Sequence, residues 1–236
     1  MKNNQSTLIN IVIYILSALI GFTLVLLATW ADVEAQYYGF YRRASAPLSS
    51  LSCPILMTPN EVNKFSLRIT NTTDQPLVPN VRTEISTPIL PDISTQSVKL
   101  APGESIVMEW PIGPENIDLG NFIFAQVLVY SSYPLPNRES MCGVFIINLP
   151  TNGRTIVALM TVLSLLGMGF GLCGLFRSSS AAGRVDILKR PLLVISLVIT
   201  VSILFTFLGW WLQNILLLVI TVLLVLVTWG LLLRTE

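Results

Sequence analysis

The first long apolar stretch of the chain spans Leu8 to Ala31 and reads LINIVIYILSALIGFTLVLLATWA, without one charged side chain. A helix needs about 20 such residues to cross the ~30 Å of hydrocarbon in a bilayer. A cleaved signal peptide is the alternative, with Val33 to Ala35 as a loose small-residue cleavage motif. The apolar core of a signal peptide has only about 7–15 residues, however. We therefore interpret residues 8–31 as a membrane-spanning helix that anchors the chain.

Two further apolar runs follow in the second half of the sequence. Residues 155–176 form one run, and residues 191–233 form another of 43 residues without an ionisable side chain. The second run is too long for a single span. Near its middle lies GWWLQN, residues 209–214, which suits a turn at the water interface, where Trp is enriched. The sequence therefore predicts spans at 192–208 and 215–233, and four membrane helices in all.

The composition excludes an ordinary cytosolic protein. Charged residues make up 11% of the 236 residues and hydrophobic ones 53%, with a mean hydropathy of +0.70, whereas soluble domains carry about a quarter of their residues as charged ones. The 14 basic and 13 acidic side chains nearly cancel, so we expect no nucleic-acid partner. The chain has no histidine, which excludes a Ser-His-Asp triad and the usual axial haem ligand. We expect no cofactor.

The distribution of Lys and Arg predicts the orientation in the membrane, because these residues concentrate on the cytoplasmic side. The loop 177–190 holds four basic residues and one acidic residue, while the long segment 32–153 holds 7 basic and 11 acidic ones. Lys2 and Arg234 lie near the two termini. The sequence thus predicts a multi-pass protein of the plasma membrane. Its termini and the basic loop would be cytoplasmic and residues 32–153 extracytoplasmic.

An aromatic cluster lies in the expected linker, residues 32–52, just after the first span. We interpret it as an interfacial anchor on the membrane, and a docking patch for a neighbouring subunit is the alternative. Tryptophans at the ends of the first, third and fourth spans belong to the same class. The anchor set is Trp30, Tyr37, Tyr38, Tyr41, Trp210 and Trp211, with Phe40 beside it.

From residue 53 to residue 150 the pattern changes to short strands separated by turns. Phe65, Leu67 and Ile69 alternate with polar residues, and FIFAQVLVY at 122–130 is a strongly apolar strand. Val98 and Leu100 precede the turn APGE, and a strand over 105–110 would return from it as a hairpin. About seven strands at this spacing predict an antiparallel β-sandwich.

Two runs in this segment, FSLRITNTTDQPLVPNVRTEIS and VKLAPGESIVMEW, resemble bacterial and archaeal immunoglobulin-like modules. The resemblance covers about 95 of the 236 residues and implies a binding or spacer module without naming a ligand. A β-rich segment between the first two of four spans also resembles claudin-like tetraspanning proteins in architecture, but their Trp and paired-Cys motif is absent. The expected fold is therefore four transmembrane helices plus an all-β immunoglobulin-like sandwich between the first and second.

Cysteine usage agrees with export. Cys53 and Cys142 are the only cysteines in the external segment, and we predict a disulfide between them, with a pair of buried thiols as the alternative. Closing a loop of 89 residues stabilises a fold by roughly 4–5 kcal/mol in the chain-entropy model. Cys173, inside the second span, is expected to be a small packing residue.

The sequence offers little catalytic chemistry. It contains no phosphate loop, Gly-x-Ser-x-Gly elbow or Cys-x-x-Cys pair. The loop 114–121 is rich in oxygen ligands and suits Ca²⁺, but it lacks the alternating spacing of a calcium loop, so we interpret it as solvated loop and predict no metal site. The Asn71-Thr72-Thr73 sequon lies in an exported turn, and its use depends on the host.

Small residues in the first two spans indicate close helix packing. Residues four apart share one helix face and allow backbones to approach, within this chain or against a partner subunit. The residues concerned are Ser17, Gly21, Gly167, Gly171 and Gly174. We therefore expect a non-catalytic integral membrane subunit that assembles or stabilises a larger complex. Its partners would be other integral membrane subunits, lipid and an exported protein bound by the sandwich. A homo-oligomeric channel or transporter component is the alternative, and a membrane enzyme using Glu115 and Asp118 is a third hypothesis.

Overall fold

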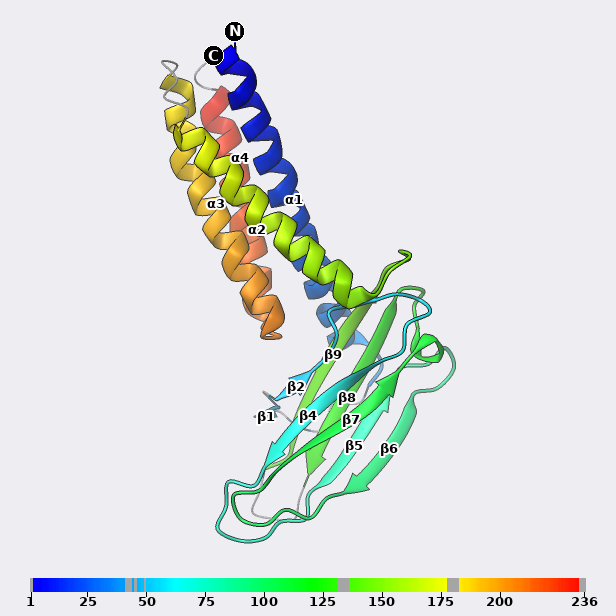
Figure 1. Cartoon of the computed structure of the whole chain (residues 1–236). Coiled ribbons are helices and arrows are strands. Elements are labelled where there is room, and N and C mark those ends of the chain that lie inside the picture. The colour runs from blue at the N-terminus through cyan, green and yellow to red at the C-terminus, as the bar shows by residue number, and fades with distance from the viewer. Residues whose placement is uncertain are drawn as a thin grey trace. The chain divides into compact units, whose positions relative to one another are not determined.

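The computed structural model describes residues 2–40, 44, 46–48, 50–130, 136–177 and 183–233. The chain divides into two compact units (Figure 1). The helical unit comprises residues 1–29 and 156–236, and the β unit comprises residues 30–155.

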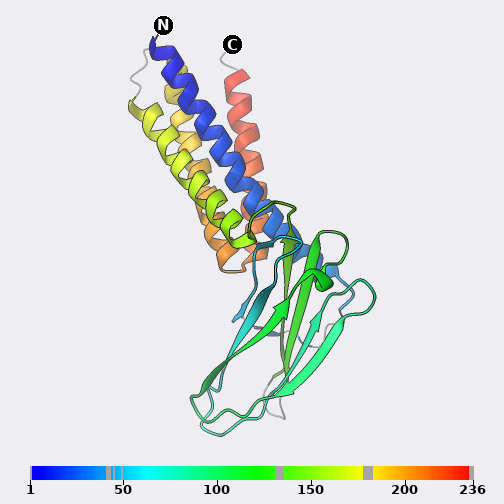
Figure 2. The ribbon, with the colours of Figure 1, turned by 45° about the vertical axis from the view of Figure 1, so that its right-hand side comes forward.

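Among the described residues, four helices are long and apolar enough to cross a membrane. They are α1 (Lys2–Tyr37), α2 (Gly153–Arg177), α3 (Gly183–Phe207) and α4 (Trp211–Leu233). Figures 1 and 2 show them running side by side in the helical unit. The number of spans agrees with the sequence prediction. The bounds differ from the prediction, because α1 begins at Lys2 and continues beyond Ala31 to Tyr37, and α4 begins at Trp211 rather than at residue 215. The prediction of a loop over residues 177–190 is wrong for its second half, since α3 begins at Gly183.

The turn between α3 and α4 is shorter than the predicted six residues. Gly209 has a positive φ of 69°. Its N–H donates to the Thr206 carbonyl at 3.2 Å, and the Trp210 N–H donates to the Phe205 carbonyl at 3.0 Å. This is the Schellman arrangement, in which a left-handed residue after the last helical turn satisfies the free carbonyls. One glycine therefore ends α3, and Gln213 and Asn214 lie within α4 instead of in the turn.

The β unit contains two sheets (Figure 1). One has six strands, in the order β1-β9-β8-β5-β6 with β3 also on β9, and the other has three, in the order β2-β4-β7. The strands are β1 (Ala46–Pro47), β2 (Leu51–Ser52), β3 (Leu56–Met57), β4 (Asn63–Thr70), β5 (Asn80–Ile85), β6 (Asp92–Ser97), β7 (Ser105–Ile112), β8 (Phe122–Tyr130) and β9 (Arg138–Ile146). The prediction of purely antiparallel pairing is wrong, since the short strands β1 and β3 pair in parallel with β9.

One hydrophobic core lies between the two sheets. Alternate residues of β4 and β7, including Phe65 and Trp110, meet alternate residues of β5, β8 and β9 there. The Phe65 and Trp110 rings stack with centroids 5.1 Å apart. The alternation along β4 thus sets the face that this strand buries. β8 buries both of its faces, because Phe122 and Phe124 belong to a second buried cluster.

The predicted hairpin around residues 101–104 is wrong. Residues 105–112 do form a strand, β7, but β7 pairs with β4 in the three-stranded sheet. Leu100 forms only an isolated bridge to Leu77. The turn therefore connects the two sheets instead of closing a hairpin.

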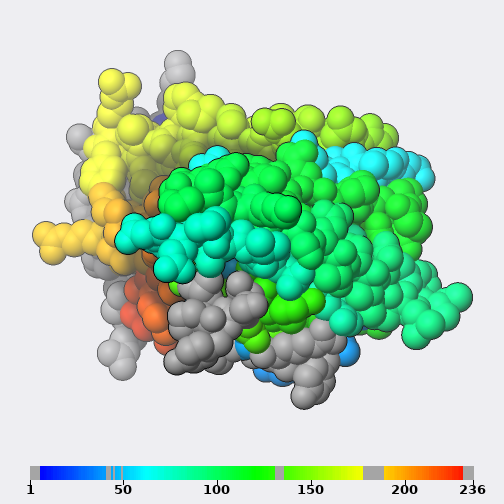
Figure 3. Space-filling model, turned by 90° about the horizontal axis from the view of Figure 1, so that it is seen from below, coloured from blue at the N-terminus to red at the C-terminus, as the bar shows by residue number. Residues whose placement is uncertain are grey.

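Asn71 links the loops at the end of the β unit where β4 ends and β7 begins. Its side chain is buried, and its amide nitrogen lies 2.8 Å from the Gln75 carbonyl, 3.2 Å from that of Leu100 and 3.0 Å from that of Ala101. Its amide oxygen accepts from the Thr73 N–H at 3.0 Å. These loops lie at the lower end of the β unit in Figure 1, the end that Figure 3 views. Because the amide nitrogen is buried and bonded, the folded sequon does not present it for glycosylation.

Candidate functional site

Small residues form a continuous seam between α1 and α2 in the helical unit. A Cβ placed on Gly167 would lie 1.8 Å from Ser17 Oγ, and one on Gly171 would lie 2.7 Å from the Cβ of Tyr14. Contacts this short require glycine, because the two backbones approach too closely for a side chain.

The seam continues in both directions. Gly21 lies against Ser164, and Gly174 lies against the Asn10 amide. The numbers of the contacting residues increase along α1 while they decrease along α2, so the two helices pack antiparallel. All five residues predicted for helix packing therefore lie in contacts within this chain.

A polar contact joins the seam to α3. The Tyr14 hydroxyl donates to the Leu192 carbonyl at 2.7 Å, and Ser196 Oγ lies 3.0 Å from the same hydroxyl oxygen. Between α3 and α4, the buried Asn214 amide lies 3.0 Å from Thr206 Oγ1. Such side chains are costly in hydrocarbon unless they are bonded. Neither contact was predicted from the sequence, although Tyr14 is the single tyrosine of the first apolar stretch.

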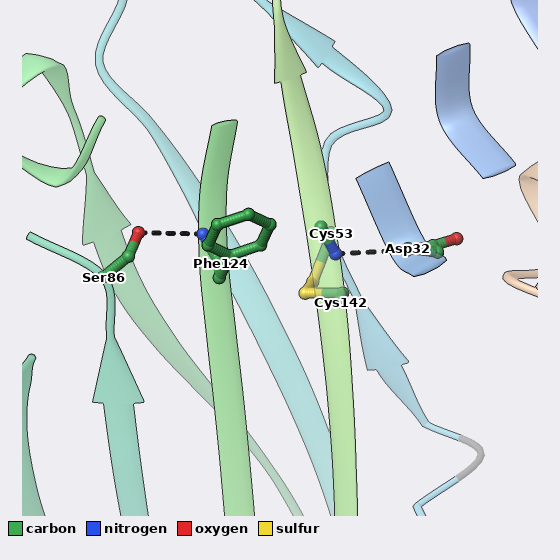
Figure 4. The surroundings of a disulfide bond; sticks show 6 residues. Asp32, Cys53, Ser86, Phe124 and Cys142 are labelled. Atoms are coloured by element: carbon green, nitrogen blue, oxygen red, sulfur yellow. Dashed lines mark hydrogen bonds between the residues drawn. A yellow bond between two sulfur atoms is a disulfide. The ribbon is translucent and has the colours of Figure 1, made fainter. Parts of the chain in front are cut away.

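Cys53 and Cys142 form the predicted disulfide, with their Cα atoms 6.4 Å apart (Figure 4). The bond joins the segment after β2 to β9. Disulfides persist in oxidising compartments. Together with the four apolar helices, the bond indicates a membrane protein with an exported, oxidised segment. Cys173 is a free thiol that is exposed on α2, so it does not pack in the interior of the helical unit as expected.

The last turns of α1 belong to the β unit and pack on its six-stranded sheet. Ala31 and Ala35 form a buried cluster with Phe122 and Phe124 of β8. Glycine is required at position 143, because a Cβ there would lie 1.9 Å from the Ala31 carbonyl oxygen. These contacts explain why α1 continues past Ala31.

Asp32 adds a polar contact to this packing. Its Oδ1 accepts a hydrogen bond from the Gly143 N–H at 3.1 Å, one residue after Cys142 (Figure 4). On the neighbouring strand, Ser86 Oγ accepts from the Phe124 N–H at 2.9 Å. Neither contact was predicted from the sequence, because both join residues far apart in the chain.

The residues of the predicted aromatic anchor lie in different environments. Tyr37 is exposed. Tyr38 packs against Phe124 with ring centroids 4.5 Å apart, and its hydroxyl donates to Asp118 Oδ2 at 2.5 Å. Burial raises the pKa of Tyr38, and the hydrogen bond and charge of Asp118 raise it further. Tyr38 therefore packs within the β unit and does not serve as a lipid anchor. Tyr41 lies outside the described residues.

The tryptophans of the anchor set keep partly exposed rings. Trp30 meets Phe122 edge to face at 5.6 Å, and its Nε1–H donates to Glu34 Oε1 at 2.8 Å. Trp210 lies 5.0 Å from Phe205 and is about half exposed. Trp211, partly buried, is the first residue of α4.

The oxygen-rich loop 114–121 uses its side chains internally. The buried Asn116 amide accepts from the Gly113 N–H at 2.9 Å and lies 3.3 Å from the Ser86 carbonyl. Asp118 accepts from Tyr38 and, at 2.7 Å, from the Leu119 N–H. Within the part of the chain that the structure describes, no three His, Cys, Asp or Glu side chains are grouped to hold a metal ion.

The six-stranded sheet ends in an open edge at β6. Hydrogen bonds just beyond the ends of β5 and β6 show which backbone groups face outward. The Val98 N–H donates to the Pro79 carbonyl at 3.0 Å, and the Ser86 N–H donates to the Phe124 carbonyl at 2.8 Å. In an antiparallel pair the bonded positions alternate. Given the register of β5 and β6, residues 93, 95 and 97 turn their N–H and C=O groups away from β5. No described strand pairs with that side of β6.

The free edge of β7 is protected instead. The Asn71 N–H donates to the Glu104 carbonyl at 2.8 Å and continues the register of β4 and β7. The backbone groups of residues 105, 107, 109 and 111 therefore face outward, and position 111 is a proline, which has no N–H. Lys64 and Glu109 form an ion pair at 2.7 Å on the adjoining face. Proline and charged side chains are common means of blocking a strand edge. β6 contains no proline, and Asp92, its first residue, is its single charged side chain, so it is the more open edge.

The comparisons with known proteins identify no family. No family model matches the chain, and no curated protein matches it. Among solved structures, a cycloisomaltooligosaccharide glucanotransferase from Paenibacillus sp., complexed with cycloisomaltoheptaose, matches 44% of this chain at 10% identity with a TM-score of 0.33. A β-glucosidase from Erythrobacter marinus matches 42% at 19% identity with a TM-score of 0.28. The aligned parts span 14% and 15% of those chains, and likenesses this weak carry no argument about activity.

Proposed function

We propose that this chain is a non-catalytic, multi-pass subunit of a larger membrane protein complex, with its β unit as an exported partner-binding module. In this arrangement α1 to α4 span the plasma membrane, both termini and the basic segment 177–190 are cytoplasmic, and residues 32–153 are outside. The excess of Lys and Arg in the basic segment supports this orientation. The Cys53–Cys142 disulfide supports an oxidising compartment for the β unit.

The β unit is proposed to be an immunoglobulin-like sandwich. Two sheets around one core and a disulfide between the start and the last strand support that assignment. The strand-and-turn runs described in the sequence are the second support.

The open edge of β6 is the observation that carries the partner-binding role. A partner strand added there would bond to the outward N–H and C=O groups of Ile93, Thr95 and Ser97, and main-chain bonding of this kind supplies affinity in β-augmentation. The side chains along the edge are short and mostly polar, which suits a soluble exported segment of the partner. The seam between α1 and α2 is used within the chain, so membrane partners would contact other helix faces.

A pair of proline substitutions tests the role of this edge. Thr95→Pro removes an outward N–H from β6 and leaves the β5 pairing intact, while Val107→Pro does the same on β7. We expect Thr95→Pro to release the exported partner from the complex extracted from native membranes, and Val107→Pro to retain it. Equal retention by both variants, with both folded, would show that β6 does not bind a partner.

A further inference from the structure

The chain enters and leaves the β unit at the same end of its sheets. At the entry, Trp30 contacts Phe122 and, at 6.0 Å, Phe145, and these two residues are register partners at the start of β8 and near the end of β9. At the exit, Gly153 N–H donates to Glu61 Oε2 at 2.8 Å, in the loop before β4. We call this the crossing end, because α1 and α2 connect to the β unit there.

Four connecting segments lie at the crossing end. β5 ends at Ile85 opposite the start of β6, and β4 begins opposite Ile112, the end of β7. Hydrogen bonds tie the segments together, since Ser86 Oγ donates to the Asn116 carbonyl at 2.7 Å and Ile146 N–H donates to the Asn121 carbonyl at 2.8 Å. The segments are residues 58–62, 86–91, 113–121 and 147–152.

Large apolar side chains project from these segments into solvent. Ile89 is 89% exposed and Leu90 74%, at the tip of a loop with prolines on both sides. Val62 is 72% exposed and Leu119 63%. Leu119 also has a φ of 47°, a conformation that is unfavourable for a bulky residue. A strained position that keeps an exposed leucine points to a function for that side chain.

The opposite end of the β unit is more polar. Its described loops contain NTTDQP at 71–76 and APGE at 101–104, and Val78 is the one large apolar residue exposed in these described loops. The apolar residues are therefore concentrated at the end where the chain passes to the apolar helices. Because adjacent strands lie about 4.8 Å apart, the loop at 86–91 is within roughly 15 Å of β9, sideways along the sheet.

We infer that the crossing end inserts Ile89 and Leu90, supported by Val62 and Leu119, into the interfacial region of the lipid bilayer. This inference rests on the proposed membrane topology and adds a lipid contact made by the β unit itself. The prolines at 88 and 91 restrict the loop, so little conformational entropy is lost when its tip is ordered. The exposed charges beside it include Asp92 and Glu115, which do not attract anionic lipid. The contact is thus apolar and independent of salt.

Depth-dependent quenching in the full chain tests this contact. Cys173→Ser removes the free thiol, and single cysteines at Ile89, Val62, Val78 or Leu223 then carry the fluorophore NBD. The protein is reconstituted in phosphatidylcholine vesicles with or without lipids that carry a doxyl quencher near the headgroup. We expect labels at positions 89 and 62 to be quenched several-fold more than the label at 78, with no change on adding salt.

The controls separate this contact from the topology on which it rests. Leu223 is exposed on α4, so quenching there by deeper doxyl groups reports that the helices span the bilayer. Quenching at 223 with equal, weak quenching at 89 and 78 would overturn the lipid contact and leave the proposed function standing. Absence of quenching at 223 would instead overturn the membrane topology, and with it the inference.

Discussion

Replacing Gly167 by alanine tests the close packing of α1 against α2. The added Cβ would lie 1.8 Å from Ser17 Oγ and 2.7 Å from Ser17 Cβ. Rotating the serine hydroxyl relieves the first clash but not the second, so the helices must move apart. Overpacking of this kind costs about 1–3 kcal/mol.

Gly169 provides the matched control on the same helix. A Cβ on Gly169 meets no atom within 4 Å. Gly169→Ala therefore gains only the helix propensity of alanine, about 0.8–1.0 kcal/mol. Because Gly167→Ala gains the same propensity, the two variants should differ in free energy of unfolding by the overpacking cost alone, about 1–3 kcal/mol, with Gly167→Ala the less stable.

The assay is equilibrium unfolding of the full chain in mixed micelles with increasing SDS, followed by helical circular dichroism. Both variants add the same methyl group to the same helix, so differences in micelle binding cancel. Equal unfolding midpoints for the two variants would refute the close packing of α1 against α2 at Gly167.

Three further predictions concern the β unit. Replacing Cys53 and Cys142 together by alanine should lower the free energy of unfolding by about 4–5 kcal/mol in the chain-entropy model, measured by denaturant titration of tryptophan fluorescence, and an unchanged midpoint would contradict the disulfide. Asn71→Ala should lower the free energy of unfolding by about 1–3 kcal/mol, because buried carbonyls lose their donor. Thr72→Ala, at an exposed position, should leave it unchanged, and equal effects of the two substitutions would contradict the role of the Asn71 amide as a buried donor. Tyr38 has a pKa raised above its ordinary value of 10.0, so its neutral form is favoured in the folded state. The stability advantage of wild type over Tyr38→Phe should therefore be constant below pH 10.0 and decline above it, and a constant difference up to pH 12 would refute the assigned environment.

The sequence was sufficient for the features that follow from local pattern. Charge-free runs of sufficient length predicted all four helices, alternation of apolar and polar residues predicted β4, and a strongly apolar run predicted β8 at its observed position. The small residues at 17 and 167 indicated a close helix contact, but spacing alone left open whether the contact was within the chain. The structure places it between α1 and α2.

The features that failed depend on residues far apart in the chain. Nothing local in DISTQS alternates between apolar and polar, so β6 was missed, and it is held by backbone pairing to β5. The extension of α1 to Tyr37 depends on Phe122 and Phe124, about 90 residues later. The sheet partner of β7 was wrong for the same reason, because the turn at 101–104 fixes the direction of the chain but not the neighbouring strand.

Native mass spectrometry of the protein, gently extracted from its own membrane, tests the proposed function most directly. We predict a particle in which this chain occurs in fixed stoichiometry with other integral membrane subunits and an exported protein. The exported protein should leave the particle in the Thr95→Pro variant and remain in Val107→Pro. Particles that contain only copies of this chain would contradict the account and favour a homo-oligomeric channel.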